Sequence, residues 1–336
     1  MPSFKSAALL IFSFSISVQA HDQTISSGLP IEAGSTEQQF SERKLPYITY
    51  PEDAQREGFI YQSENFRFAS NQTLSPNLIE EIEDLCEATY KGLSKLPLNL
   101  LQADHGKRFE VSLFLNQADY LKAGGIKGTG GIYLPKKERT LIRLDLLTEQ
   151  IRNSGDQLCK RKSKILVHEI THQAQHQWLG KMPTWLLEGI AVYMESIPYK
   201  DGEFDFEAAH FRDSEGVNHC TTNRLSVTNL ETLMSMSGRE WIEDFKKNPK
   251  SVHRNYLSAY LLTYYFLHME GDGSAARIKK YFHAMKHAFS RHDRLRAKSS
   301  LMDGKTVAEL EADLIAAYEN EGMRLVPING YLLSSR

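Results

Sequence analysis

The segment His168-Glu169-Ile170-Thr171-His172 has the residue types and spacing needed to bind a metal ion and to activate a water molecule beside it. In an α-helix, positions four apart lie on the same face, so the two imidazoles would lie together with the Glu169 carboxylate next to them. Imidazole nitrogens are common Zn2+ ligands, and a nearby carboxylate can accept a proton from water. The segment therefore predicts a site for one Zn2+ ion, with Glu169 as general base.

The elements that would position these residues can be read from the surrounding pattern. Residues 160–179 contain no Gly or Pro, Gly180 offers a stop, and Pro183 lies just beyond. This pattern predicts one helix over residues 160–179, and Pro183 suits the first turn of a second helix over residues 183–196. The apolar positions of the first helix include Ile165, Leu166, Ile170 and Ala174.

Glu188 is the acidic residue within the otherwise almost wholly apolar run Trp185–Tyr193. A buried carboxylate is costly unless it is paired or bound to a cation. If the second helix folds back across the first, Glu188 reaches His168 and His172 and completes a His2Glu set with one position open for water. The sequence therefore predicts His168, His172 and Glu188 as the metal ligands.

Plainer explanations for the same residues stay open at this stage. The two histidines could form a hydrogen-bonded pair without a metal, and Glu188 could lie on a solvated helix face. His176 extends the same face, but along a continuous helix its Cα would lie about 12 Å from that of His168. We therefore expect His176 to lie outside the ligand set.

These segments resemble the gluzincin metallopeptidases, in particular the secreted bacterial peptidase-MA-like proteins. The resemblance is most specific in H-E-I-T-H and in W-L-x-E-G-x-A at Trp185–Ala191, and Asn255–Ala259 adds to it. It covers about residues 60–325. The metzincin pattern fits less well, because it needs Gly and His where this chain has Gln175 and Trp178. Further similar segments are 109–115 with Tyr120, 130–135 and 307–318.

The resemblance implies a zinc metallopeptidase, a hydrolase in which Glu169 accepts the proton of the attacking water and passes it to the leaving amine. It also implies an oxyanion donor, for which Tyr256 is the candidate, because Tyr256 and Ala259 match the Y-x-x-[GA] pattern. A core or rim tyrosine is an equal alternative for Tyr256 on this aromatic-rich helix. The G-x-M-E-N segment that is typical of the aminopeptidase relatives is not found in this sequence, and its absence favours an endopeptidase.

The chain also departs from these relatives. Fifteen residues separate His172 from Glu188, a short connection, and Val192 stands where thermolysin-like enzymes have an Asp. The group that orients the histidines is therefore left open. A module that binds zinc or peptide without turnover is the alternative function, although binding alone would not require the Glu169 base.

The N-terminus predicts export. Lys5 precedes an apolar stretch over residues 7–18, and Val18-Gln19-Ala20 offers a cleavage site. We expect a signal peptide at 1–20, a flexible lead-in or propeptide at 21–58, and a secreted or periplasmic protein without an integral membrane segment after processing. At most one disulfide is expected, because there are three cysteines, Cys86, Cys159 and Cys220.

Composition and periodicity predict an α+β fold of 336 residues, with an α/β lobe and a helical lobe. The net charge of −2, without a long basic stretch, disfavours nucleic acid and anionic membranes as partners. The resemblance to metallopeptidases implies a peptide or protein substrate. In the zincins that this chain resembles, an edge strand lines the cleft and pairs with the substrate backbone, and we predict that residues 131–145 supply it. The predicted α/β lobe covers residues 59–159 and contains a helix from 75 to about 96 and a small mixed sheet that includes 111–115, 132–134 and 140–144. The predicted helical lobe covers residues 160–325, with further helices near 183–196, 228–236, 255–270, 274–289 and 306–320. A tail is predicted at 326–336.

Overall fold

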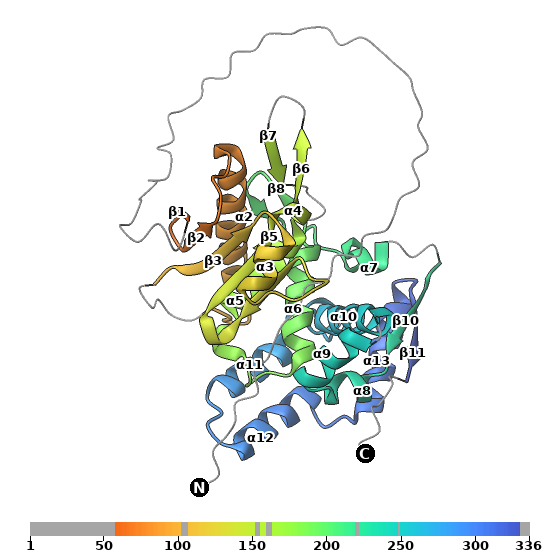
Figure 1. Ribbon diagram of the computed structural model, residues 1–336. Helices are drawn as coiled ribbons and strands as arrows, with labels where there is room; N and C mark the ends of the chain where they lie inside the picture. The colour runs from red at the N-terminus through yellow and green to blue at the C-terminus, as the bar shows by residue number, and fades with distance from the viewer. Residues whose placement is uncertain are drawn as a thin grey trace, which may run out of the picture.

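The computed structural model describes residues 58–101, 107–151, 155–158, 163–218, 222–247 and 249–329 (Figure 1). The predicted signal peptide at 1–20 lies outside these residues, as do nearly all of the predicted lead-in and both Cys159 and Cys220. Cys86 is described, and it is a buried free thiol. No helix in the described part of the chain is long and apolar enough to cross a bilayer.

A mixed five-stranded sheet forms the N-terminal part, in the order β1-β2-β3-β5-β4. The pairs β2–β3 and β3–β5 are parallel, whereas β1–β2 and β4–β5 are antiparallel, so β4 is an edge strand. The three strands predicted from the sequence are β3, β4 and β5, and β1 and β2 extend the sheet. The bounds are β1 (Phe59–Gln62), β2 (Phe66–Ser70), β3 (Phe109–Phe114), β4 (Gly131–Leu134) and β5 (Arg139–Arg143).

Helices cover both faces of this sheet. On one face, α2 (Pro76–Lys95) begins where the Ser75 side chain accepts a hydrogen bond from the Leu78 amide, and it buries its apolar positions against the sheet and α5. On the other face, α3 (Gln117–Ala123) covers a small cluster of Tyr120, Ile132, Leu134 and Leu141. The other elements here are η1 (Pro135–Lys137), α4 (Leu144–Leu147), and the β6 (Thr148–Ile151) and β7 (Gly155–Leu158) hairpin.

The C-terminal part is mainly helical, which confirms the predicted α+β class. Helix α6 packs closely against α10, and α5 lies between α6 and the sheet (Figure 1). Two of the longer helices here, α9 and α12, were not predicted, nor were the short strands of this part. The bounds are α5 (Lys164–Ala174), η2 (His176–Trp178), α6 (Thr184–Ser196), β8 (Tyr199–Lys200), β9 (Glu203–Phe204), η3 (Phe211–Asp213), α7 (Glu215–Asn218), β10 (Arg224–Thr228), α8 (Leu230–Ser235), α9 (Gly238–Lys247), α10 (Pro249–Tyr264), η4 (Tyr265–Met269), α11 (Ala276–Lys286), α12 (Arg291–Met302), α13 (Val307–Asn320) and β11 (Arg324–Ile328).

The predicted single helix over residues 160–179 is wrong at its C-terminal end. The α-helix ends at Ala174, because Gln175 has φ −78° and ψ 5°, and the chain continues as the tighter 3-10 turn η2. The indole nitrogen of Trp178 donates a hydrogen bond to the Leu100 carbonyl at 2.9 Å. The tightened turn directs the chain into α6 after only a short connection.

The strand β11 runs through residue 328 and therefore includes the first three residues assigned from the sequence to the tail. It pairs in parallel with β10, with Arg324 opposite Arg224 and Ile328 opposite Thr228. One face of α10 packs against β10. Residues 324–328, near the end of the described chain, are thus hydrogen-bonded to β10, the strand that precedes α8.

Candidate metal centre

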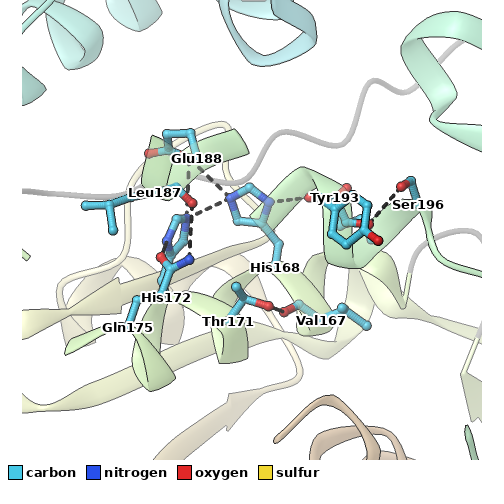
Figure 2. A network of polar contacts seen from close by, with 10 residues as sticks. Val167, His168, Thr171, His172, Gln175, Leu187, Glu188, Tyr193 and Ser196 are labelled. Atoms are coloured by element: carbon cyan, nitrogen blue, oxygen red, sulfur yellow. Dashed lines mark hydrogen bonds and ion pairs between the residues drawn. The ribbon is translucent and has the colours of Figure 1, made fainter. Parts of the chain in front are cut away.

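His168 and His172 on α5 and Glu188 on α6 converge, as the sequence predicted. Figure 2 shows the three side chains turned toward one another. The Nε2 atoms of His168 and His172 lie 2.9 Å apart, and Oε2 of Glu188 lies 3.4 Å from the first and 3.3 Å from the second. All three residues are buried, each with 1% of its surface exposed or less. Together they form a group that could hold one metal ion.

The second nitrogen of each imidazole has its own acceptor. Nδ1 of His168 contacts Oε1 of Glu195, and Nδ1 of His172 lies 3.3 Å from Oε1 of Gln175. A carboxylate and an amide oxygen accept hydrogen bonds, so both Nδ1 atoms are assigned as donors and both Nε2 atoms keep a lone pair. The two lone pairs therefore face the same small space as the Glu188 carboxylate.

The two Nε2 atoms and Oε2 of Glu188 are arranged better for binding a metal ion than for bonding to one another. Oε2 of Glu188 is buried and makes no hydrogen bond within the described part of the chain, although both Nε2 atoms lie near it. Three electron-rich atoms facing one another repel unless a cation, either a proton or a metal ion, lies between them. Ligands about 2.0–2.1 Å from a tetrahedral Zn2+ lie about 3.4 Å apart. The observed triangle, with edges of 2.9, 3.3 and 3.4 Å, comes close to this spacing.

The electrostatics of the group also favour a cation. Burial alone lowers the pKa of His168, but the carboxylates of Glu195 and Glu188 outweigh burial and raise that pKa above its usual value. Burial lowers the pKa of His172, against the opposing effect of Glu188. Burial would raise the pKa of Glu188, but His172 and His168 lower it. The negative field that stabilises a proton here would also stabilise a divalent metal, which requires neutral imidazoles.

Glu169, the predicted general base, is completely buried on α5 and adjoins the edge strand β4. The backbone of Gly131 lies so close that an added Cβ atom would be 2.7 Å from Cγ of Glu169. A side chain at position 131 would therefore displace this carboxylate. The predicted edge strand is thus next to the catalytic candidate, and a glycine permits the close approach.

Tyr256, the predicted oxyanion donor, lies beside the group on α10. Its ring centroid is 6.0 Å from that of His168, and the Trp241 ring packs edge-on against it at 5.2 Å. Burial raises the pKa of the Tyr256 phenol well above its usual value, and the nearby Glu188 carboxylate raises it further. A phenol in this setting keeps its proton and can donate it in a hydrogen bond. The structure therefore brings Tyr256 next to the ligand set.

A pocket of about 80 Å³ opens beside this group and includes His168, Glu195 and Tyr256 in its lining. A larger pocket of about 460 Å³ adjoins it, because Lys164, Glu195 and Ser196 line both. The larger pocket has an apolar lining that includes Leu85 and Phe204. The buried donor atoms thus lie at the edge of a space that a ligand can enter.

His176 lies outside the ligand set, as predicted. Its side chain is 39% exposed, and its Nδ1 is 2.7 Å from the hydroxyl of Tyr133. The 3-10 turn that begins there directs the ring toward the sheet rather than toward His168. This ring belongs to the packing between η2 and β4.

Sequence reasoning missed Glu195 and Gln175, the two partners of the histidines. Glu195 lies seven residues after Glu188 on α6, two turns further along the same helix face. Gln175 lies one turn after His172, and its amide also donates to the Leu187 carbonyl at 3.4 Å, which links the end of α5 to α6. The signal for Glu195 was its spacing from Glu188, since Val192 occupies the expected position.

Comparison of the chain with protein families and with curated proteins finds no match. The assignment of the centre therefore rests on its residues and their geometry.

Proposed function

We propose that this protein is a zinc-dependent peptidase of the gluzincin type, exported from the cell, that cleaves peptide or protein substrates as an endopeptidase. The observation that carries the proposal is the convergence of two lone-pair-bearing imidazoles and one buried carboxylate next to a further buried carboxylate, Glu169. A metal site without chemistry needs the first three groups, but not the fourth.

In this proposal, His168, His172 and Glu188 hold one Zn2+ ion. Zn2+ in such a set supplies Lewis acidity, which lowers the pKa of water toward neutrality and polarises a carbonyl group. Glu195 and Gln175 fix the orientation of the two rings by accepting from their Nδ1 atoms. The ligand set is thereby preorganised before substrate arrives.

Glu169 accepts the proton of the attacking water and then delivers it to the nitrogen of the leaving amine. Tyr256 donates its hydroxyl hydrogen to the oxygen on which negative charge develops during the attack. The substrate backbone extends along β4, the edge strand beside Glu169, and pairs with it as an added strand. This arrangement presents a peptide carbonyl between the base and the ligand set.

The test compares zinc content and peptide cleavage for the native chain and for Glu169→Gln. We expect both proteins to bind one zinc ion and the variant to lose cleavage by about 10²–10⁴-fold, because Gln cannot accept the proton. A digest of a peptide library with sequencing of the new termini measures cleavage and separates internal from terminal cuts. Glu207→Gln, a change at an exposed position, is the matched control and keeps full activity.

Unchanged cleavage by Glu169→Gln would refute the mechanism. Zinc binding by the native chain without cleavage of any peptide would favour the alternative, a zinc-binding or peptide-binding module on the same scaffold. Loss of zinc from His172→Ala, with the fold intact by circular dichroism, checks the ligand set independently.

A further inference from the structure

The helical hairpin of α11 and α12 carries a strong positive charge that the net charge of the whole chain does not reveal. Residues 276–298 contain eight Lys and Arg residues and one acid, Asp293, in a chain whose net charge is −2. The hairpin lies at the end of the molecule away from the β6–β7 hairpin (Figure 1). The cations are therefore concentrated on one region of the surface rather than spread over it.

These cations are accessible. Arg277 pairs with Glu270, but the other seven are exposed, and none of them has a carboxylate within ion-pair distance among the described residues. Asp293 caps the first turn of α12 by accepting from Ser290. Clustered cations that outnumber the acids near them repel one another, so an anionic partner stabilises them. The seven are Lys279, Lys280, Lys286, Arg291, Arg294, Arg296 and Lys298.

Two large apolar side chains project from the same hairpin. Phe289 lies in the turn between the helices and is 87% exposed, and Leu295 on α12 is 56% exposed. In the rest of the described chain, the one other exposed large apolar residue is Tyr199, at 41%. An apolar tip flanked by cations is typical of a segment that inserts into a membrane interface.

A hollow of about 290 Å³ adjoins the two helices. Arg291, Arg294 and Lys298 line it together with apolar side chains, so it offers cations and an apolar surface side by side. This combination is complementary to a lipid, because the anionic phosphate headgroup can pair with the cations and the acyl chain can contact the apolar surface. The apolar lining includes Met182, Trp185, Met234, Tyr281, Met285 and Leu295.

We propose that the α11–α12 hairpin docks the protein on an anionic membrane surface. The exposed cations contact lipid phosphates, and Phe289 and Leu295 enter the interface between headgroups and acyl chains. The proposal replaces the expectation drawn from net charge, because a surface responds to local charge rather than to the total. Lipid is favoured over nucleic acid because an exposed Leu and an apolar hollow gain nothing from a phosphodiester backbone.

The test measures co-sedimentation of the full chain with vesicles of phosphatidylcholine alone or mixed with phosphatidylglycerol. We expect binding only to the mixed vesicles, and loss of binding at high salt. The triple variant Lys286→Glu/Arg294→Glu/Lys298→Glu should weaken binding by about a hundredfold or more, since each cation contributes about a fivefold factor near such a surface. Phe289→Ser should weaken it by about tenfold.

The matched control is Lys122→Glu/Lys127→Glu/Lys136→Glu, which changes net charge equally at exposed positions of the N-terminal part. It should bind as the native chain does, and circular dichroism checks that every variant is folded. Equal loss in both triple variants would show nonspecific attraction and overturn the proposal, as would failure of the native chain to bind. Tighter binding to duplex DNA than to vesicles, unaffected by Phe289→Ser, would assign the surface to nucleic acid instead. None of these readouts depends on peptidase activity.

Discussion

At the scale of single residues, the candidate centre depends on side chains that bind no metal themselves. Glu195 and Gln175 determine which nitrogen of each imidazole carries a hydrogen. Without them, each ring could present an N–H where the metal needs a lone pair. Their contribution can be measured separately from that of the ligands.

We predict that Glu195→Ala lowers zinc affinity by about 10–100-fold, because His168 loses its acceptor. Glu195→Gln should have a smaller effect, since an amide oxygen still accepts but carries no charge. Competition with a chromophoric chelator measures the affinity, and Glu207→Gln at an exposed position serves as control. Native affinity in Glu195→Ala would mean that this contact does not orient the ring.

Glu83 on α2 gives a prediction for pH dependence. Burial, and then the charges of Asp84, Glu80 and Glu87, raise the pKa of Glu83 from 4.5 to about 7. Because its pKa is higher in the folded state than in the unfolded state, the stabilisation from protonated Glu83 is complete below about pH 4.5 and is lost as the pH rises to about 7.

Glu83→Gln should therefore melt at a temperature roughly 2 °C higher than the native chain at about pH 8, with a smaller difference at about pH 5. Thermal unfolding at both values, with Glu207→Gln as the charge-matched control, measures this. A difference independent of pH would contradict the explanation.

At the scale of elements, the position of Glu188 depends on how closely α6 approaches α10. A Cβ atom on Gly189 would lie 2.1 Å from Oγ1 of Thr263 and 2.4 Å from the Ala259 carbonyl oxygen. The two helices can meet at this distance only because residue 189 has no side chain. The glycine of the W-L-x-E-G-x-A segment thus has a packing role beside its glutamate.

We predict that Gly189→Ala pushes the helices apart, costs about 1–3 kcal/mol of unfolding free energy, and weakens zinc binding because Glu188 moves with its neighbour. Gly92→Ala is the matched control in the interior of α2, where the new Cβ would meet only side-chain atoms at 3.2 Å or more. Denaturant unfolding and zinc titration measure both effects. Equal stability of the two variants would contradict the prediction.

The sequence predicted the elements whose patterns are local and strong. Residues 76–95 repeat apolar positions at helical spacing, and residues 184–196 are almost wholly apolar. Both helices were predicted. The short strands β10 and β11 were not, because each is specified by a partner 100 residues away. The helix α12 was missed because it is polar nearly all round and buries only Ala297 and Leu301.

The same distinction applies to the centre. The two histidines and Glu169 share one turn of helix, so their spacing alone predicted that they lie together. Glu188 was predicted as a ligand because burying an unpaired carboxylate in an apolar helix is energetically costly. The approach of Gly131 to Glu169 could not be predicted, because it depends on which strand lies at the sheet edge. The partner of His168 depends on the angle between α5 and α6, which no local pattern specifies.

At the scale of the whole molecule, a bound metal would join α5, which packs on the sheet, to α6, which packs on α10. Binding to the folded state alone stabilises it, by about 4 kcal/mol at a free-metal concentration 1,000 times the dissociation constant. We predict that a chelator lowers the melting temperature of the native chain but not that of His172→Ala. Calorimetry with parallel metal analysis measures this, and metal loss without a change in melting temperature would contradict it.

The parallel pairing of β10 with β11 has a consequence for timing. Thr228 on β10 donates two hydrogen bonds to α10: its hydroxyl donates to Oδ1 of Asn255 at 2.6 Å, and its amide donates to the Ser258 hydroxyl at 2.8 Å. These contacts flank Tyr256, yet the ladder beside them closes only after Arg324–Ile328 has been synthesised. The region around Tyr256 can therefore mature only after residue 328 has left the ribosome, so completion of this side of the centre waits for a segment about 100 residues further along the chain.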